Sequence, residues 1–152
     1  IYPTMVIKNT ALEQLYKIGK YTPENLQNTV ETCAKLYMLF YENNINVLRM
    51  GLYSDKELIE EGNIVAGCFH PSFGELVFSK IYLDKAKEQI RDGKFKDKDI
   101  EIFVKPGSIS KMAGNKRYNV TKLLKEFCIK SIKIKEDSTL SDFEVKIFEK
   151  RL

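Results

Sequence analysis

The chain has 152 residues, of which 43% are hydrophobic and 30% are charged, the composition of an ordinary globular protein. This length suits one domain or two small ones. No apolar run approaches the roughly 20 residues of a membrane-spanning helix, so we expect no membrane partner. The odd number of cysteines, Cys33, Cys68 and Cys128, excludes a fully paired disulfide framework and favours a reducing, cytoplasmic compartment. We expect these thiols to be buried or half-buried.

The net charge of +4 is unevenly distributed along the chain. Residues 94–135 contain 12 Lys or Arg against 4 Asp or Glu, whereas the rest of the chain has 13 basic and 17 acidic residues. A basic block of this kind predicts an anionic partner, such as RNA or a phosphate-bearing ligand. A solvated, lysine-rich surface without a partner is the alternative.

The first part of the chain has the pattern of a strand, a long helix and a second strand. Residues 2–8 and 46–53 are mainly apolar runs, which predict buried strands. A short helix is expected over 11–18, and a Thr-Pro-Glu start at 22–24 begins a helix that reaches about Glu42. Because strands joined by a helix are normally parallel, we predict a βαβ unit of a (β/α) barrel. The predicted inner faces of the two helices consist of Leu12, Leu15 and Tyr16, and of Leu26, Val30, Cys33, Ala34, Tyr37 and Tyr41.

The second part begins with a helix and ends in a small α+β unit. We expect a helix from His70 to Arg91 and an exposed, lysine-rich linker over 93–98. Alternating apolar residues then predict a half-buried strand over 100–104. The elements of the tail have the order β-α-α-β-β, and those after its first strand are expected over 106–113, 119–127, 131–135 and 143–147.

The first twenty-one residues resemble a block inside radical S-adenosylmethionine (SAM) enzymes. In the elongator catalytic subunit and its bacterial relatives, a late barrel strand reads Tyr-Pro-Thr-apolar-Val-Ile, followed by basic-small-Thr, Leu-x-x-Leu and Gly-x-Tyr. The matching residues here are Tyr2, Pro3, Thr4, Val6, Ile7, Lys8, Thr10, Leu12, Leu15, Gly19 and Tyr21. Asn9 stands where the family usually has glycine.

Residues 65–77 are similar to a second run of the same bacterial branch, Val-x-Gly-Pro-Phe-His-Pro-x-Phe, which follows the last barrel strand. Cys68 replaces the proline of that run. His70 is the only histidine, and it could bind substrate or move a proton because imidazole titrates near neutral pH. A capping or packing role at the start of a helix is the alternative.

The resemblance implies that this chain is the C-terminal part of a radical SAM enzyme. The family's Cys-x3-Cys-x2-Cys run is absent here, so we expect no cofactor on this fragment itself. A missing N-terminal half would hold a [4Fe–4S] cluster and SAM, cleave SAM reductively, and act on tRNA or another substrate. Family members are often labelled oxygen-independent coproporphyrinogen III oxidase, and that oxidoreductase activity stays open as an alternative.

Barrel enzymes place their chemistry at the C-terminal ends of the strands. The two predicted strands carry Lys8, Arg49 and Gly51 near those ends. Lys and Arg hold carboxylates or phosphates, and glycine lets a ligand approach the backbone closely. The resemblance implies a supporting role for these residues in SAM binding, with no catalytic or metal-binding residue in this chain. An ion pair between Arg49 and a carboxylate of the missing barrel is the alternative.

The basic tail resembles the K-homology (KH) RNA-binding motif, in which the backbone of a Gly-x-x-Gly turn lies against RNA phosphates. Residues 112–120 follow the frame apolar-apolar-Gly-x-Gly-Gly-x-Asn-apolar at Gly114 and Asn119, while Lys116 and Arg117 replace both later glycines. The residues predicted to bind substrate or RNA are His70, Lys111, Gly114, Lys116, Arg117 and Lys122. A small α/β cap without RNA affinity, covering the barrel end, is the alternative.

The predicted fold class is therefore α/β, with the last βαβ unit or units of a radical SAM (β/α) barrel followed by a small KH-like α+β domain. We expect a barrel piece over 1–68, a connecting helix over 69–93 and the small basic domain over 94–152. Strand edges that a complete barrel would cover predict self-association. The expected partners are thus the N-terminal radical SAM half, tRNA and further copies of the chain.

Overall fold

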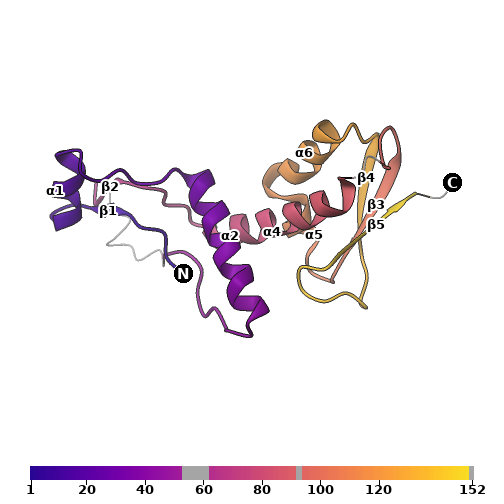
Figure 1. The fold of residues 1–152 in the computed structure, drawn as a ribbon, viewed down its shortest axis with the longest axis horizontal. Coiled ribbons are helices and arrows are strands. Elements are labelled where there is room, and N and C mark those ends of the chain that lie inside the picture. Colours follow the sequence, from indigo (N-terminus) through magenta and orange to yellow (C-terminus); the bar gives the residue numbers. More distant parts are fainter. Residues whose placement is uncertain (53–61, 92–93, 151–152) are drawn as a thin grey trace. The chain divides into compact units, whose positions relative to one another are not determined.

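The computed structural model describes residues 1–52, 62–91 and 94–150. The chain forms two compact units, Ile1–Val77 (unit 1) and Phe78–Leu152 (unit 2), and helix α4 (Phe73–Ile90) belongs to both. Figure 1 shows the order of the elements along the chain. In the described ranges, no helix combines the length and the apolar character that crossing a membrane requires.

Unit 1 contains a small antiparallel sheet and two further helices. Its elements are β1 (Val6–Ile7), α1 (Ala11–Lys17), α2 (Leu26–Glu42), β2 (Ile64–Ala66) and the start of α4 (Figure 1). Strand β1 pairs with β2, with Val6 opposite Ala66. The predicted buried strand over 2–8 is therefore confirmed only at Val6–Ile7, and its ladder partner is 64–66 in place of 46–53.

The predicted strand over 46–53 is wrong over 46–52, and its last residue lies outside the described residues. The backbone there forms no ladder, and Leu48 is 91% exposed. Two hydrogen bonds remain: the Ile1 amine donates to the Arg49 carbonyl at 2.8 Å, and the Gly51 N–H donates to the Ile1 carbonyl at 2.9 Å. In a parallel pair of strands, the N–H and the carbonyl of one residue bond to the two residues on either side of the residue opposite it. Ile1 thus pairs in parallel with Met50, in the direction expected of a βαβ unit.

The helices of unit 1 form where expected, with different caps and inner faces. Helix α2 begins three residues after the predicted start, because the Asn25 side chain caps it by accepting from the Asn28 N–H at 2.9 Å. The side chains of α2 that are fully buried are Cys33 and Ala34. In α1, Leu15 is 41% exposed, although it was predicted to face inward. Further apolar side chains of α2 that are exposed are Leu26, Leu36, Leu39 and Tyr41.

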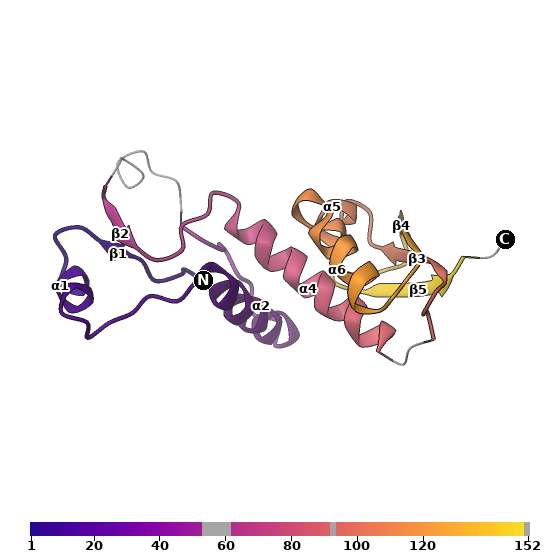
Figure 2. The same ribbon diagram turned by 90° about the horizontal axis from the view of Figure 1, so that it is seen from above.

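Unit 2 has the predicted element order. Its elements are β3 (Asp99–Val104), α5 (Ile109–Ala113), a 3-10 turn η1 (Asn115–Arg117), α6 (Tyr118–Glu126), β4 (Ser131–Glu136) and β5 (Val145–Glu149). The central strand β3 pairs in parallel with β4 and antiparallel with β5. Figures 1 and 2 show α5, α6 and the unit 2 part of α4 on one side of this sheet. The β-α-α-β-β prediction is confirmed.

The core of unit 2 lies between the sheet and these helices. Ile100, Ile102 and Val104 alternate with less buried residues along β3, as a half-buried strand requires. The other fully buried apolar side chains include Ile90, Met112 and Leu123. Phe95 is 4% exposed, so the predicted exposed linker over 93–98 is wrong at this residue.

Two further expectations in unit 2 need correction. Phe143 lies before β5, in a turn at φ 61°, and its N–H donates to the Tyr82 hydroxyl at 3.3 Å.

Cys128 is exposed, whereas Cys33 and Cys68 of unit 1 are buried, as predicted. Burial, together with the nearby Cys68, raises the pKa of the Cys33 thiol.

Gly51 tests the packing of unit 1. Its φ is +83°, and a Cβ there would lie 3.0 Å from the Cβ of Phe73, whereas Gly19 has φ +72° with nothing within 4 Å. We expect Gly19→Ala to lower the free energy of unfolding by about 1 kcal/mol through backbone strain alone. Gly51→Ala should cost about 1–3 kcal/mol more, through overpacking. Urea unfolding of both variants measures the difference, and equal losses would contradict this packing.

Candidate functional site

The residues predicted at the strand ends do not converge on one point. Ile1 lies opposite Met50, so Arg49 is level with the start of the chain, while Lys8 lies seven residues further along its own segment. Lys8 is exposed, and its N–H donates to the Asn63 carbonyl at 2.9 Å. The backbone register therefore separates Lys8 from Arg49, and their role toward SAM stays a prediction.

Gly51 has a packing partner in the structure. The side of Gly51 that a Cβ would occupy faces Phe73 at the start of α4. The glycine thus allows close contact between the 46–52 segment and that helix. This contact explains the glycine without a ligand.

His70 forms the turn that leads into α4. Its Nδ1 accepts a hydrogen bond from the Ser72 N–H at 3.1 Å, and its carbonyl accepts from the Phe73 N–H at 3.1 Å. A neutral imidazole with this contact carries its proton on Nε2. This contact orders the turn before α4, and both the capping role and a role toward substrate stay predictions.

The donor set of the described residues does not fit an iron–sulfur cluster. A [4Fe–4S] cluster takes four cysteine thiolates as its usual ligands. Two of the three cysteines are buried in unit 1 and the third is exposed in unit 2, and the described ranges bring no three His, Cys, Asp or Glu residues together as a metal-binding group. We therefore derive no step through a cluster from these residues.

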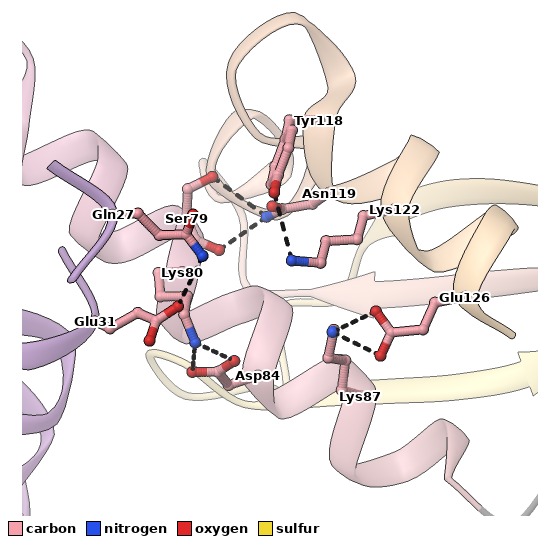
Figure 3. Close-up of polar contacts among 10 residues, drawn as sticks. All are labelled: Gln27, Glu31, Ser79, Lys80, Asp84, Lys87, Tyr118, Asn119, Lys122 and Glu126. Carbon is pink, nitrogen blue, oxygen red and sulfur yellow. Dashed lines mark hydrogen bonds and ion pairs between the residues drawn. The ribbon is translucent and has the colours of Figure 1, made fainter. Parts of the chain in front are cut away.

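A second group of predicted residues surrounds the loop between α5 and α6, and a buried amide anchors it. Asn119 is 2% exposed, and its Nδ2 donates to the Ser79 carbonyl at 2.8 Å and to the Met112 carbonyl at 3.1 Å. The Ser79 hydroxyl donates to the Lys111 carbonyl at 2.7 Å. Figure 3 shows Asn119 pointing toward Ser79 of α4. One amide thus connects α4, the end of α5 and the start of α6.

Gly114 and Asn119 match the KH-like frame for a structural reason. Gly114 has φ +76°, and a Cβ there would lie 3.0 Å from the Asn119 Cγ and 3.0 Å from its backbone nitrogen. Any larger residue would therefore displace the amide that anchors the loop. The two residues work as a pair, and sequence reasoning missed Ser79 because it comes from a distant helix.

Lys116 and Arg117 occupy the left-handed region of backbone space, at φ 48°, ψ 35° and φ 60°, ψ 27°. Residues other than glycine rarely adopt this conformation, which costs about 1–2 kcal/mol each. The KH-like frame has glycine at both positions. This chain instead places two exposed cations there. The backbone turn is closed by a hydrogen bond in which the Arg117 N–H donates to the Gly114 carbonyl at 3.0 Å.

The loop belongs to a stretch of the sequence that is uniformly basic. Residues 106–125 contain five Lys or Arg and no Asp or Glu. We call Lys111, Lys116, Arg117, Tyr118 and Lys122 the basic loop face. Within it, Lys111 Nζ lies 5.1 Å from the centre of the Phe78 ring, and Lys122 Nζ lies 5.5 Å from that of Tyr118. Sequence reasoning missed Tyr118, which is 57% exposed and stands four residues before Lys122 on α6.

The backbone strain at Lys116 and Arg117 can be measured. Replacing both by glycine relieves the left-handed conformation, so we expect the free energy of unfolding to rise by about 0.5–1 kcal/mol per site. Lys122→Gly serves as the control, because glycine in the interior of α6 should cost about 1 kcal/mol. Thermal or urea unfolding checks both. A double-glycine variant less stable than the parent chain would mean that the strain is absent.

Comparison with known proteins agrees with the first of the two resemblances. Residues 1–83, more than half of the chain, match the family described as the Radical_SAM C-terminal domain. No curated protein and no solved structure matches the chain. The match covers both blocks that resemble radical SAM enzymes, from Tyr2 to Val77. The chain therefore belongs to the Radical_SAM C-terminal domain family.

Proposed function

We propose that this chain is the C-terminal part of an elongator-like radical SAM enzyme and completes it by docking onto an N-terminal radical SAM half. The family match over residues 1–83 carries this proposal. The [4Fe–4S] cluster and SAM belong to the N-terminal half, where the cluster would supply the electron for reductive cleavage of SAM. The substrate we propose is tRNA, and coproporphyrinogen III is the alternative that the family's labels suggest.

The apolar surface around the 46–49 segment supports this docking. Ile1, Tyr2, Phe40 and residues 45–49 line a hollow of about 310 Å³. Ile45 is 54% exposed and Tyr2 is 58% exposed. In the described residues, the backbone groups of residues 46–48 also belong to no strand ladder. Burying such side chains gives about 25 cal/mol per Å² of apolar surface, which favours a covering partner.

Leu48 offers a direct test of the docking. Because it is 91% exposed, Leu48→Asp should leave the melting temperature of the 152-residue chain unchanged. In the complete enzyme the same change would bury an unpaired charge, so the melting temperature should fall by several degrees. Ile109→Asp, at a 39% exposed residue of unit 2, is the control and should have little effect in either protein.

Two results would decide against this proposal. The first is an equal effect of Leu48→Asp on the isolated chain and on the complete enzyme. The second is a concentration-dependent dimer of the isolated chain that Leu48→Asp dissociates, since a second copy would then be the partner of this surface.

A second candidate function, RNA binding, is supported by the charge of unit 2. Residues 78–152 contain 19 basic and 12 acidic residues, and the basic loop face contains no carboxylate. Lys116 and Arg117 are exposed and keep a strained conformation. Exposed Lys and Arg side chains bind the phosphates of nucleic acids, and the counterions that the phosphates release favour binding.

Reversing these charges tests the RNA candidate. The double variant Lys116→Glu with Arg117→Glu should weaken RNA binding at least tenfold and lower its salt dependence by about two phosphate contacts. Lys133→Glu with Lys146→Glu, on β4 and β5, is the matched control and should bind as the parent chain does. Filter binding of a labelled RNA between low and physiological salt measures both. Equal losses in the two variants would indicate attraction by net charge alone.

A further inference from the structure

Tyr118 belongs to the basic loop face, and more than half of its side chain is open to solvent. It is 57% exposed and directly follows Lys116 and Arg117 in the sequence. The amide of the next residue, Asn119, is buried and anchored to Ser79 and Met112. The backbone beneath Tyr118 is therefore fixed, while its side chain projects from the surface.

Lys122 steadies this ring from the following turn of α6. Its Nζ lies 5.5 Å from the ring centre and 3.4 Å from the Tyr118 hydroxyl oxygen. Figure 3 shows the two side chains directed toward each other. Because Lys122 approaches one face of the ring and more than half of Tyr118 stays exposed, the ring has room for a flat, apolar group.

An exposed aromatic ring beside Lys122, and next in sequence to the exposed cations Lys116 and Arg117, fits a nucleobase with its phosphates. Bases stack on aromatic side chains while Lys and Arg hold the adjoining backbone. Bases within a duplex already stack on one another, so an exposed ring selects unpaired bases.

The other large exposed aromatic side chain of unit 2 lacks these surroundings. Phe148 is 55% exposed and lies on the sheet opposite Glu101. Glu101 pairs with Lys135 at 2.6 Å, and Lys146, two residues before Phe148 on β5, lies 3.9 Å from Glu144. The cations near Phe148 are therefore neutralised in part, and Phe148 serves as a control with nearly the same exposure as Tyr118.

We propose that the basic loop face binds single-stranded RNA, with an unpaired base stacked on Tyr118 and the neighbouring phosphates bound by Lys116, Arg117 and Lys122. This inference rests on the RNA-binding candidate above and deepens it. It adds a residue, Tyr118, and a substrate class, unpaired nucleotides. The anchored loop supplies a preformed site, so the chain orders little on binding.

The experiment uses the 152-residue chain and a labelled, unstructured 12-nucleotide RNA that contains 2-aminopurine, a base whose fluorescence falls on stacking. Tyr118→Ala should weaken binding at least about fivefold, from the usual contribution of one stacked base. It should also restore the 2-aminopurine fluorescence. Tyr118→Phe keeps the ring and should bind within about twofold of the parent chain, and Phe148→Ala should have no effect. A 12-base-pair duplex of the same sequence should bind more weakly than the single strand.

The outcomes separate the inference from the function on which it rests. Failure of the parent chain to bind any RNA overturns both. A second result would overturn the stacking inference alone. In it, Lys116→Glu with Arg117→Glu abolishes binding, Tyr118→Ala leaves binding unchanged, and duplex and single strand bind equally. The stacking inference is supported if Tyr118→Ala loses binding, Tyr118→Phe keeps it, and the 2-aminopurine fluorescence changes as expected.

Discussion

Backbone pairing is the constraint on which unit 1 depends. A buried N–H or C=O needs a partner, and a strand is stable only beside another strand. In the described part of unit 1, ladder pairing extends over the few residues of β1 and β2, and the 46–50 segment is held by two bonds to Ile1. The exposed side chains of Leu48, Ile45 and Tyr2 follow from this incomplete pairing. A domain of the Radical_SAM C-terminal family that docks onto its N-terminal half would complete both the pairing and the apolar contacts.

Unit 2 depends instead on one buried amide. The Asn119 amide donates to the Ser79 carbonyl of α4 and to the Met112 carbonyl at the end of α5, and Gly114 leaves the space that this amide needs. With the loop ends fixed in this way, Lys116 and Arg117 keep a left-handed backbone that glycine would adopt more easily. Strained backbone conformations cluster at functional sites, and the strained residues here are cations, which supports the proposed RNA binding.

The sequence predicted unit 2 better than unit 1, for a physical reason. The alternation of apolar Ile100, Ile102 and Val104 with other residues predicts a strand with one buried face. Both strands that pair with it, β4 and β5, lie in the same unit. The 46–53 run is equally apolar, but its exposure depends on a partner surface that a local pattern does not encode. Helix α2 ends as predicted, while its start moved to Asn25 because two capping patterns stand three residues apart. In the candidate site, the glycine and asparagine of the loop were recognised, whereas Ser79 and Tyr118 were missed because tertiary contact and exposure define their roles.

The most direct test of docking by unit 1 is hydrogen exchange of the backbone amides of residues 46–50, compared between this chain and the complete enzyme. In the isolated chain we expect these amides to exchange rapidly. In the complete enzyme we expect them to be protected to the level of a buried parallel strand. Equal exchange rates in the two proteins would show that no N-terminal half covers this segment and would contradict the account.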